Sequence, residues 1–125
     1  MRKRGTIIIE TDEGILLTAM SSGTYLLPGG GVNKGESRFR AAIRELEEET
    51  GLKANYAEII FRHVSKSQEH TVVLVKARGI PFPKREIKFI DYYQPNKKIK
   101  MSSGTKEIIE KYYHWKKHTN HQKDD

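Results

Sequence analysis

The chain contains no cysteine and no long apolar run, and both absences restrict what it can be. Its 125 residues include no Cys, which excludes disulfide bonds, zinc–thiolate sites and a cysteine nucleophile. No stretch approaches the roughly 18 consecutive apolar residues of a membrane-spanning helix, so we expect no membrane partner. The basic start at residues 1–4 is followed by a short apolar run that ends at Glu10, which is too short for a secretory signal. We therefore expect a cytoplasmic protein.

The length and the modest apolar content, 36% of residues, suit a single domain with one hydrophobic core. We expect this domain to span residues 1–118. The last seven residues, 119–125, are polar, and we expect them to form a disordered tail. The sequence leaves the oligomeric state open.

The charge is strongly basic, with a net charge of +7 and a pI of about 9.6. Basic residues gather at 2–4, 84–88, 97–100 and 116–117. A basic surface suits an anionic ligand, either a nucleotide or a nucleic acid, although a single charge cluster is more often plain solvated surface. The charge alone does not separate small substrates from polymeric ones.

The most informative segment is Gly30–Leu52, which reads GGVNKGESRFRAAIRELEEETGL. On a helix, Glu45, Glu48 and Glu49 stand at i, i+3 and i+4 and therefore share one face. Three crowded carboxylates repel one another unless cations neutralise them. Arg44 can offset one charge, and a divalent metal would offset the rest. Hard cations such as Mg²⁺ prefer oxygen ligands of this kind.

The same helix has a second, apolar face, and a glycine-rich loop precedes it. The apolar residues follow the i, i+3, i+4, i+7 spacing that predicts packing on a sheet: Phe39, Ala42, Ile43 and Leu46. In the loop, glycine allows close approach of the backbone. We expect Gly29 and Gly30 to bring backbone N–H groups and the helix N-terminus toward a phosphate. A plain tight turn is the alternative interpretation.

The spacing G-x5-E-x7-R-E-U-x-E-E-x-G-U, with U an aliphatic residue, is matched at every position between Gly30 and Leu52. Seven fixed identities at fixed spacing arise by chance on the order of once in 10⁸ start positions. The segment resembles the signature of the Nudix hydrolases, a family that cleaves nucleoside diphosphates linked to other moieties. The Leu-Pro-Gly-Gly run before it is also similar, although Tyr25 stands where the family often has Trp. The resemblance covers about residues 5–118, but only the signature is specific.

The resemblance implies an α/β fold, the Nudix α/β/α sandwich around a mixed β-sheet. It also implies a pyrophosphohydrolase that depends on Mg²⁺, with Mn²⁺ as an alternative cation. The implied metal ligands are Glu48 and Glu49, with Glu45 a ligand or a base, and Arg44 would orient these carboxylates. The number of metals and the identity of the linked moiety stay open.

A base outside the signature is a further expectation. In some members of the family an acidic residue ahead of an aromatic residue in a later strand fills this role. Glu86 matches that placement, six positions before Tyr92. Glu69 and Asp91 are the alternatives. Equally, Glu86 can pair with its basic neighbours at the surface, where such pairs contribute little.

The remaining elements follow from hydrophobic periodicity and turn residues. We expect a hairpin followed by a helix, three further strands and a second helix, over residues 5–10 and 15–19, 37–50, 56–64, 71–76, 86–93 and 105–118.

Several histidines and tyrosines are weaker candidates. Three histidines have helical spacing that suits a metal, but they stand near the chain end, where we expect a tail: His114, His118 and His121. His63 and His70 flank a loop and could donate to a phosphate, although solvent exposure is the simpler expectation. Tyr92 and Tyr93 could stack on a base, with core packing as the default.

Two functions follow from these observations. The first is an enzyme that hydrolyses a nucleoside diphosphate linked to another group, with a small-molecule nucleotide as its partner. The second is a non-catalytic nucleotide- or RNA-binding domain of the same fold, which the basic surface keeps open. The complete set of signature carboxylates favours the enzyme.

Overall fold

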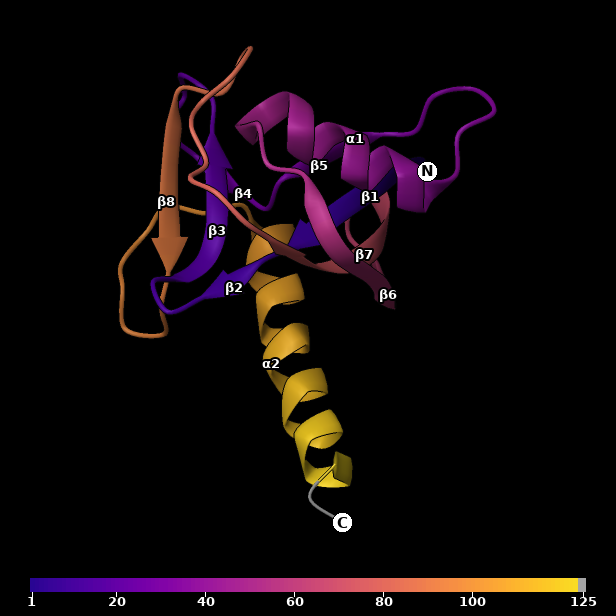
Figure 1. Cartoon of the computed structure of the whole chain (residues 1–125), viewed down its shortest axis with the longest axis vertical. Helices are drawn as coiled ribbons and strands as arrows, with labels where there is room; N and C mark the ends of the chain where they lie inside the picture. The colour runs from indigo at the N-terminus through magenta and orange to yellow at the C-terminus, as the bar shows by residue number, and fades with distance from the viewer. Residues whose placement is uncertain (124–125) are drawn as a thin grey trace.

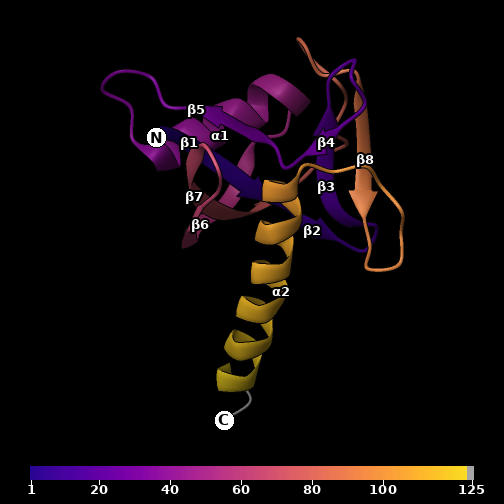
Figure 2. The same ribbon diagram turned by 180° about the vertical axis from the view of Figure 1, so that it is seen from behind.

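The computed structural model describes residues 1–123. Two helices lie on opposite sides of a β-sheet, and α2 extends well beyond the body of the molecule (Figures 1 and 2). The elements in chain order are β1 (Arg2–Ile8), β2 (Glu10–Thr11), β3 (Gly14–Ala19), β4 (Tyr25–Leu26), β5 (Gly29–Gly31), α1 (Arg38–Thr50), β6 (Ala54–Val64), β7 (Gln68–Ala77), β8 (Phe89–Tyr93) and α2 (Ser103–Lys123).

The central sheet is mixed and has the strand order β5-β1-β7-β6. Strand β1 runs parallel to β7, whereas β5 pairs antiparallel with β1, and β6 antiparallel with β7. A second sheet is antiparallel and joins β2, β3 and β4, with β8 paired to β3. The expected α/β/α arrangement around a mixed sheet is confirmed, and the second sheet is an addition to it.

Alternation along β1 divides the core between the two helices, because successive side chains of a strand point to opposite faces. Ile7 and Ile9 belong to a cluster with Ala42 and Leu46 of α1. Ile8 belongs to the other cluster, which includes residues of α2. Leu46 is fully buried, so the apolar face predicted for the first helix is the buried one.

Helix α1 begins and ends at the residues that its sequence predicts. Ser37 has extended backbone geometry, and its hydroxyl accepts a hydrogen bond from the N–H of Arg40, as an N-cap residue does. Gly51 has φ of +80° and ends the helix in the left-handed conformation, which glycine adopts without steric cost. Both signals are local, and they fix the position of the carboxylate face.

Several predicted elements have different bounds in the structure. Strand β7 begins at Gln68 and not at residue 71, so Glu69 and His70 lie in a strand rather than in the predicted loop. The hairpin consists of β2 and β3 only, because β1 continues into the other sheet and pairs with β7. Strand β8 begins at Phe89 rather than at Glu86, because residues 84–87 form a turn in which Arg85 has φ of +54°. Helix α2 begins two residues earlier and continues to Lys123. Disorder of the tail stays a prediction, and its last two residues lie outside the described part of the chain.

Within that part of the chain, neither helix is both long enough and apolar enough to cross a membrane.

Candidate active site

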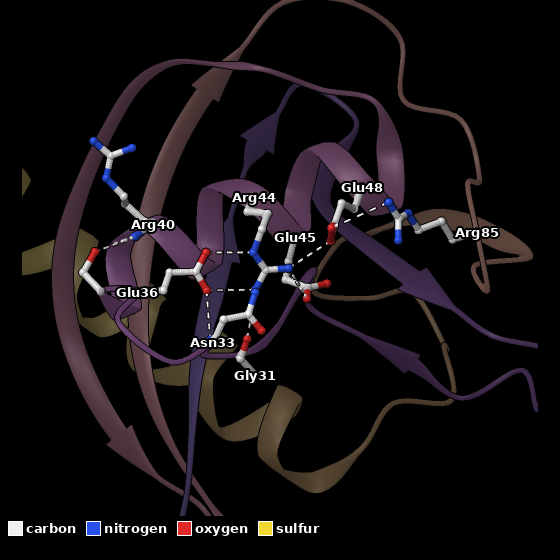
Figure 3. A network of polar contacts seen from close by, with 9 residues as sticks. Gly31, Asn33, Glu36, Arg40, Arg44, Glu45, Glu48 and Arg85 are labelled. Atoms are coloured by element: carbon white, nitrogen blue, oxygen red, sulfur yellow. Dashed lines mark hydrogen bonds and ion pairs between the residues drawn. The ribbon is translucent and has the colours of Figure 1, made fainter.

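Arg44 is the centre of a polar network on the carboxylate face of α1 (Figure 3). One guanidinium nitrogen, Nη1, donates to Glu45 Oε1 and to Glu48 Oε2, both at 2.9 Å. A second, Nη2, donates to the carbonyl oxygen of Gly31 at 3.1 Å. A single side chain therefore fixes two signature carboxylates relative to the loop that precedes the helix, as expected of a residue that orients them.

Glu36 completes the network through a two-point ion pair with Arg44. Arg44 Nε donates to Glu36 Oε2 at 2.7 Å, and Nη2 donates to Oε1 at 3.0 Å. The hydrogen bonds from Arg44, joined by one from the N–H of Asn33, lower the pKa of Glu36 to about 2. The same pairing raises the pKa of Arg44. Glu36, which precedes the helix, is thus the main partner of this arginine, and helical spacing alone does not predict that pairing.

Glu49 lies deeper than its two neighbours. Its Oε1 accepts a hydrogen bond from the N–H of Gly29 at 3.1 Å. Burial raises its pKa to about 7, helped by the negative charges of Glu45 and Glu48, and the Gly29 N–H and Arg4 oppose this only in part. Glu49 is therefore a largely buried carboxylate beside two others, and a bound cation would neutralise part of this negative charge.

Gly29 and Gly30 are the two glycines that we expect to bind a phosphate. In the structure they lie against glutamates of the helix. Gly29 and Gly30 belong to β5, which pairs with β1. A Cβ atom at Gly30 would lie 2.5 Å from Glu45 Cδ, so any larger residue would displace that carboxylate. The glycines bring the backbone against the carboxylate face, and phosphate binding by them stays a prediction.

The donor set suits a hard divalent cation, but the ligands are not drawn together. Glu45, Glu48 and Glu49 offer oxygen atoms only, which Mg²⁺ prefers. Among the side chains that the structure describes, no three His, Asp or Glu residues form a ready-made metal site. Arg44 lies between two of the carboxylates, and Arg85 approaches Glu48 at 3.7 Å. The residues fit the cation in chemistry and in charge, and small side-chain movements would be needed to gather them.

A cavity of about 830 Å³ borders the network and is lined by α1 and by the turn before β8. Its wall includes Glu36, Arg44 and Glu48 from the network, together with Lys84 and Arg85. Cations and carboxylates thus share one depression, which can accommodate a phosphate-bearing group on the exposed side of the network.

The three candidate bases outside the signature have different surroundings. Glu86 is exposed in the turn at residues 84–87, and the hydrogen bonds and ion pairs of the described residues do not join it to the signature glutamates. Glu69 is paired with Arg38 at 2.7 Å. Asp91 is paired with Lys97; burial raises its pKa, but the hydrogen bonds from Lys97 and the Tyr92 N–H outweigh this, so its pKa is lowered. The identity of the base stays a prediction.

The expectation of exposed histidines was wrong for His70, which is only 6% exposed. Its Nδ1 lies 2.8 Å from Thr6 Oγ1 and its Nε2 lies 3.1 Å from Ser65 Oγ. Burial lowers its pKa to about 4, so the ring is neutral at pH 7. His63 contacts Glu107 at 2.8 Å.

The remaining weak candidates are the histidines near the chain end and two neighbouring tyrosines. His114 and His118 contact each other, with 3.0 Å between their Nε2 atoms, but the side chain of His121 lies outside the described residues. Tyr92 and Tyr93 pack against the two core clusters, as the default interpretation predicted.

Sequence reasoning missed Arg4. It treated this residue as one of a basic cluster at the start of the chain. The structure places it in β1, largely buried, with Nη2 donating to the carbonyl oxygen of Leu27 at 2.9 Å. Alternation along the strand puts Arg4 on the same face as Thr6 and Ile8. This position could have marked Arg4 as unusual, because charged residues rarely face a core.

Comparison with known proteins agrees with the fold. The family model described as the NUDIX domain matches residues 1–115. A crystal structure of a Nudix hydrolase family member from Chromobacterium violaceum superposes with a TM-score of 0.85 and 37% sequence identity, covering 91% of this chain and 77% of that one.

Two curated relatives are similar over different lengths. An RNA pyrophosphohydrolase from Erythrobacter litoralis is 36% identical in an alignment 66 residues long, which covers 49% of this chain and 40% of the relative. An ADP-ribose pyrophosphatase from Methanocaldococcus jannaschii is 28% identical in an alignment 120 residues long, which covers 87% of this chain and 71% of the relative. The chain thus spans less than half of the first relative. With a family model that matches nearly its whole length, the chain belongs to the Nudix hydrolase family.

Proposed function

We propose that this protein is a divalent-cation-dependent pyrophosphohydrolase that cleaves a nucleoside diphosphate linked to another group. The observation that carries the proposal is the cluster of Glu45, Glu48 and Glu49 on one helix face, in which Arg44 holds the first two and the Gly29 N–H holds Glu49. The names of the similar proteins support the same reaction class, since they include an RNA pyrophosphohydrolase and an ADP-ribose pyrophosphatase.

Each residue of the network has a role that follows from its contacts. Glu48 and Glu49 would hold Mg²⁺ or Mn²⁺, with Glu45 as a further ligand or as the base. When bound, the cation supplies charge neutralisation for phosphate oxygens and makes a water molecule more acidic. Arg44 keeps Glu45 and Glu48 in position, and the Gly29 N–H does the same for Glu49.

The reaction needs no nucleophilic side chain, because a water molecule can attack the phosphorus atom of the anhydride. A base must then accept a proton from that water within hydrogen-bond reach. Carboxylates that hold a cation are poor bases, because the cation lowers their pKa. A glutamate or aspartate outside the cation's ligands is the better choice, and Glu86 stays our first candidate by placement.

The experiment for the base compares Glu86→Gln with Glu69→Gln and Asp91→Asn over a range of pH. The variant that lacks the base should lose rate and also the acidic limb of its pH profile, because that limb reports protonation of the base, while the other two keep both. If Glu86→Gln retains the wild-type rate and profile, Glu86 is not the base. In that case a changed profile in Glu69→Gln or Asp91→Asn would identify the base instead.

The proposed function itself is tested with a substrate panel. The panel contains nucleoside triphosphates, nucleotide sugars, dinucleoside polyphosphates, ADP-ribose and a 5′-triphosphorylated RNA, each incubated with Mg²⁺ and with excess chelator. We expect release of a phosphorylated product from at least one compound, and only with the cation. Hydrolysis that persists fully in chelator would refute the proposal.

The RNA member of the panel is included for a specific reason. A surface cavity of about 660 Å³ is lined by four lysines and two tyrosines: Lys97, Lys98, Lys100, Lys106, Tyr93 and Tyr113. Lysines contact phosphates, and aromatic rings can stack on bases. Binding of RNA without any hydrolysis would favour the alternative, a non-catalytic RNA-binding domain.

A further inference from the structure

A second cavity, distinct from the one beside Arg85, lies between β1, the β6–β7 loop and the first turn of α2. Its volume is about 240 Å³. Figures 1 and 2 both show the start of α2 beside β1. Polar side chains dominate its lining, and the signature glutamates do not line it. The cavity therefore lies outside the carboxylate network.

Arg4 is the residue that makes this cavity unusual. Its Nε donates to Thr6 Oγ1 at 3.3 Å and its Nη2 to the Leu27 carbonyl at 2.9 Å, both neutral partners. Among the described residues, the ion pairs do not include Arg4. Arg4 therefore has no described carboxylate within ion-pair distance, and only the more distant Glu49 and Glu45 offset its charge. A largely buried guanidinium in this position is stabilised when an anion joins it.

Arg4 also connects the cavity with the candidate active site. In the β1–β5 pairing, Arg4 lies opposite Gly31 and Thr6 lies opposite Gly29. The Gly29 N–H in turn holds Glu49. Burial lowers the pKa of Arg4, and the negative charges of Glu49 and Glu45 act in the opposite direction. A substrate on the carboxylate face could thus extend one group past β5 to Arg4.

The rest of the lining selects for negative charge. Lys66 supplies a second cation at the exposed rim, and Ser65, Gln68 and Ser102 supply hydrogen-bonding groups. His70 is neutral, with both ring nitrogens in contact with hydroxyl groups. Among the described residues, the lining includes no Asp or Glu and no Phe, Tyr or Trp. Such a cavity repels no anion and offers no ring on which a nucleobase could stack.

The first turn of α2 adds to the preference of the cavity for anions, which comes mainly from Arg4. Ser102 caps the helix, because its hydroxyl oxygen accepts a hydrogen bond from the N–H of Thr105 at 3.2 Å. Ser103 and Gly104, which come next, line the cavity. The first N–H groups of a helix have no partner within it, and they favour anions.

We propose that this cavity binds a phosphate group of the substrate beyond the scissile diphosphate, with Arg4 as the residue that selects for it. The substrate is then a compound with at least one further phosphate, either a longer polyphosphate chain or a phosphomonoester on the linked moiety. The inference rests on the proposed function, because it assigns the group to a substrate that the signature carboxylates also hold.

The first test measures binding of inorganic phosphate by isothermal titration calorimetry in excess chelator, so that no metal contributes. The variants are Arg4→Gln and Lys66→Gln, with Arg62→Gln as the matched control, because Arg62 is an exposed arginine on β6 that does not line the cavity. We expect wild type and the control to bind phosphate equally. Loss of a charge-assisted hydrogen bond should weaken binding by about 10-fold or more in Arg4→Gln.

Lys66→Gln keeps the test decisive if Arg4→Gln unfolds, because Lys66 is exposed at the rim and its replacement leaves the core intact. Thermal unfolding without phosphate checks the fold of each variant. Absence of phosphate binding in the wild type overturns the inference. Unchanged binding in a folded Arg4→Gln also overturns it, and where Arg4→Gln does not fold, unchanged binding in Lys66→Gln does so.

A second test separates substrate phosphate from free phosphate. With the best substrate of the panel and Mg²⁺, inorganic phosphate should raise KM in the wild type and have a weaker effect in Arg4→Gln. A change of kcat without a change of KM would mean that the cavity serves free phosphate, which overturns the assignment to substrate. Failure of the proposed function has a different result: no hydrolysis of any compound, with phosphate binding unaffected.

Discussion

Replacement of Gly5 by alanine is the most quantitative test of how α1 is placed. Gly5 lies in the middle of β1, opposite Gly30 of β5 and Thr71 of β7. A Cβ atom there would lie 2.5 Å from the Arg38 carbonyl oxygen and 2.6 Å from the Ala42 nitrogen. Both are backbone atoms of α1, so no side-chain rotation can relieve the clash.

The expected magnitude follows from these distances. Ordinary contacts at Cβ begin at 3.4 Å, so α1 must move by about 1 Å or the sheet must bend. Forcing a methyl group into a packed core costs about 1–3 kcal/mol, which lowers Tm by roughly 4–12 °C in a domain of this size. The helix carries Glu45, Glu48 and Glu49, and a misplacement of about 1 Å can cost on the order of 10²-fold in rate.

The assay is thermal unfolding by circular dichroism in chelator, with Gly104→Ala as control. At Gly104 in α2 the nearest atom to an added Cβ is Ser65 Cβ, at 3.4 Å, and alanine is favoured over glycine in helices by up to about 1 kcal/mol. Replacement of glycine by alanine should therefore lower the stability of the protein at position 5, and it should leave the stability equal or higher at position 104. A Tm for Gly5→Ala at or above the wild-type value would refute direct packing of α1 on β1.

Three further variants test the core, the polar network and a buried histidine. Leu46→Ala should cost roughly 2–5 kcal/mol in the free energy of unfolding by emptying a fully buried site, measured by urea denaturation; an unchanged midpoint would show that this face is not buried. Arg44→Lys keeps the charge but cannot make the two-point pair with Glu36, so kcat should fall by about 10-fold or more while Tm changes little, and a wild-type rate would contradict the orienting role. His70 has a folded-state pKa of about 4, against an ordinary value of 6.5, so it contributes stability above pH 6.5 that is lost as the pH falls toward 4, by about 1.4 kcal/mol for each pKa unit. The stability advantage of wild type over His70→Gln should shrink across that window, and a constant difference would show that His70 does not titrate there.

The parts of the fold that the sequence predicted depend on local signals. Ser37 and Gly51 determine the ends of α1 through contacts within one helical turn, and the apolar spacing determined its buried face. The pairing of β1 with β7 could not be predicted, because it joins residues more than sixty positions apart. Strand β5 was predicted as a loop, because its three glycines are ordered by contacts with β1 and α1, which lie elsewhere in the sequence.

The candidate site could likewise be predicted only in part. Helical spacing alone placed Glu45, Glu48 and Glu49 on one face. It could not show that Glu36 would reach back to Arg44, because that contact depends on the path of the loop before the helix. Arg4 was missed for a related reason: its burial is produced by segments distant in sequence, which include Leu27 and the start of α2.

The central claim is that the carboxylates of α1 hold a catalytic cation, and Glu49→Gln tests it most directly. The measurement is kcat for the best substrate of the panel with Mg²⁺, beside the control Glu47→Gln, which changes an exposed glutamate of the same helix. The account predicts a loss of at least about 10²-fold for Glu49→Gln, because charge stabilisation by a held metal contributes several kcal/mol. It predicts a wild-type rate for Glu47→Gln and a folded protein in both cases. A near wild-type rate in a folded Glu49→Gln variant would contradict it.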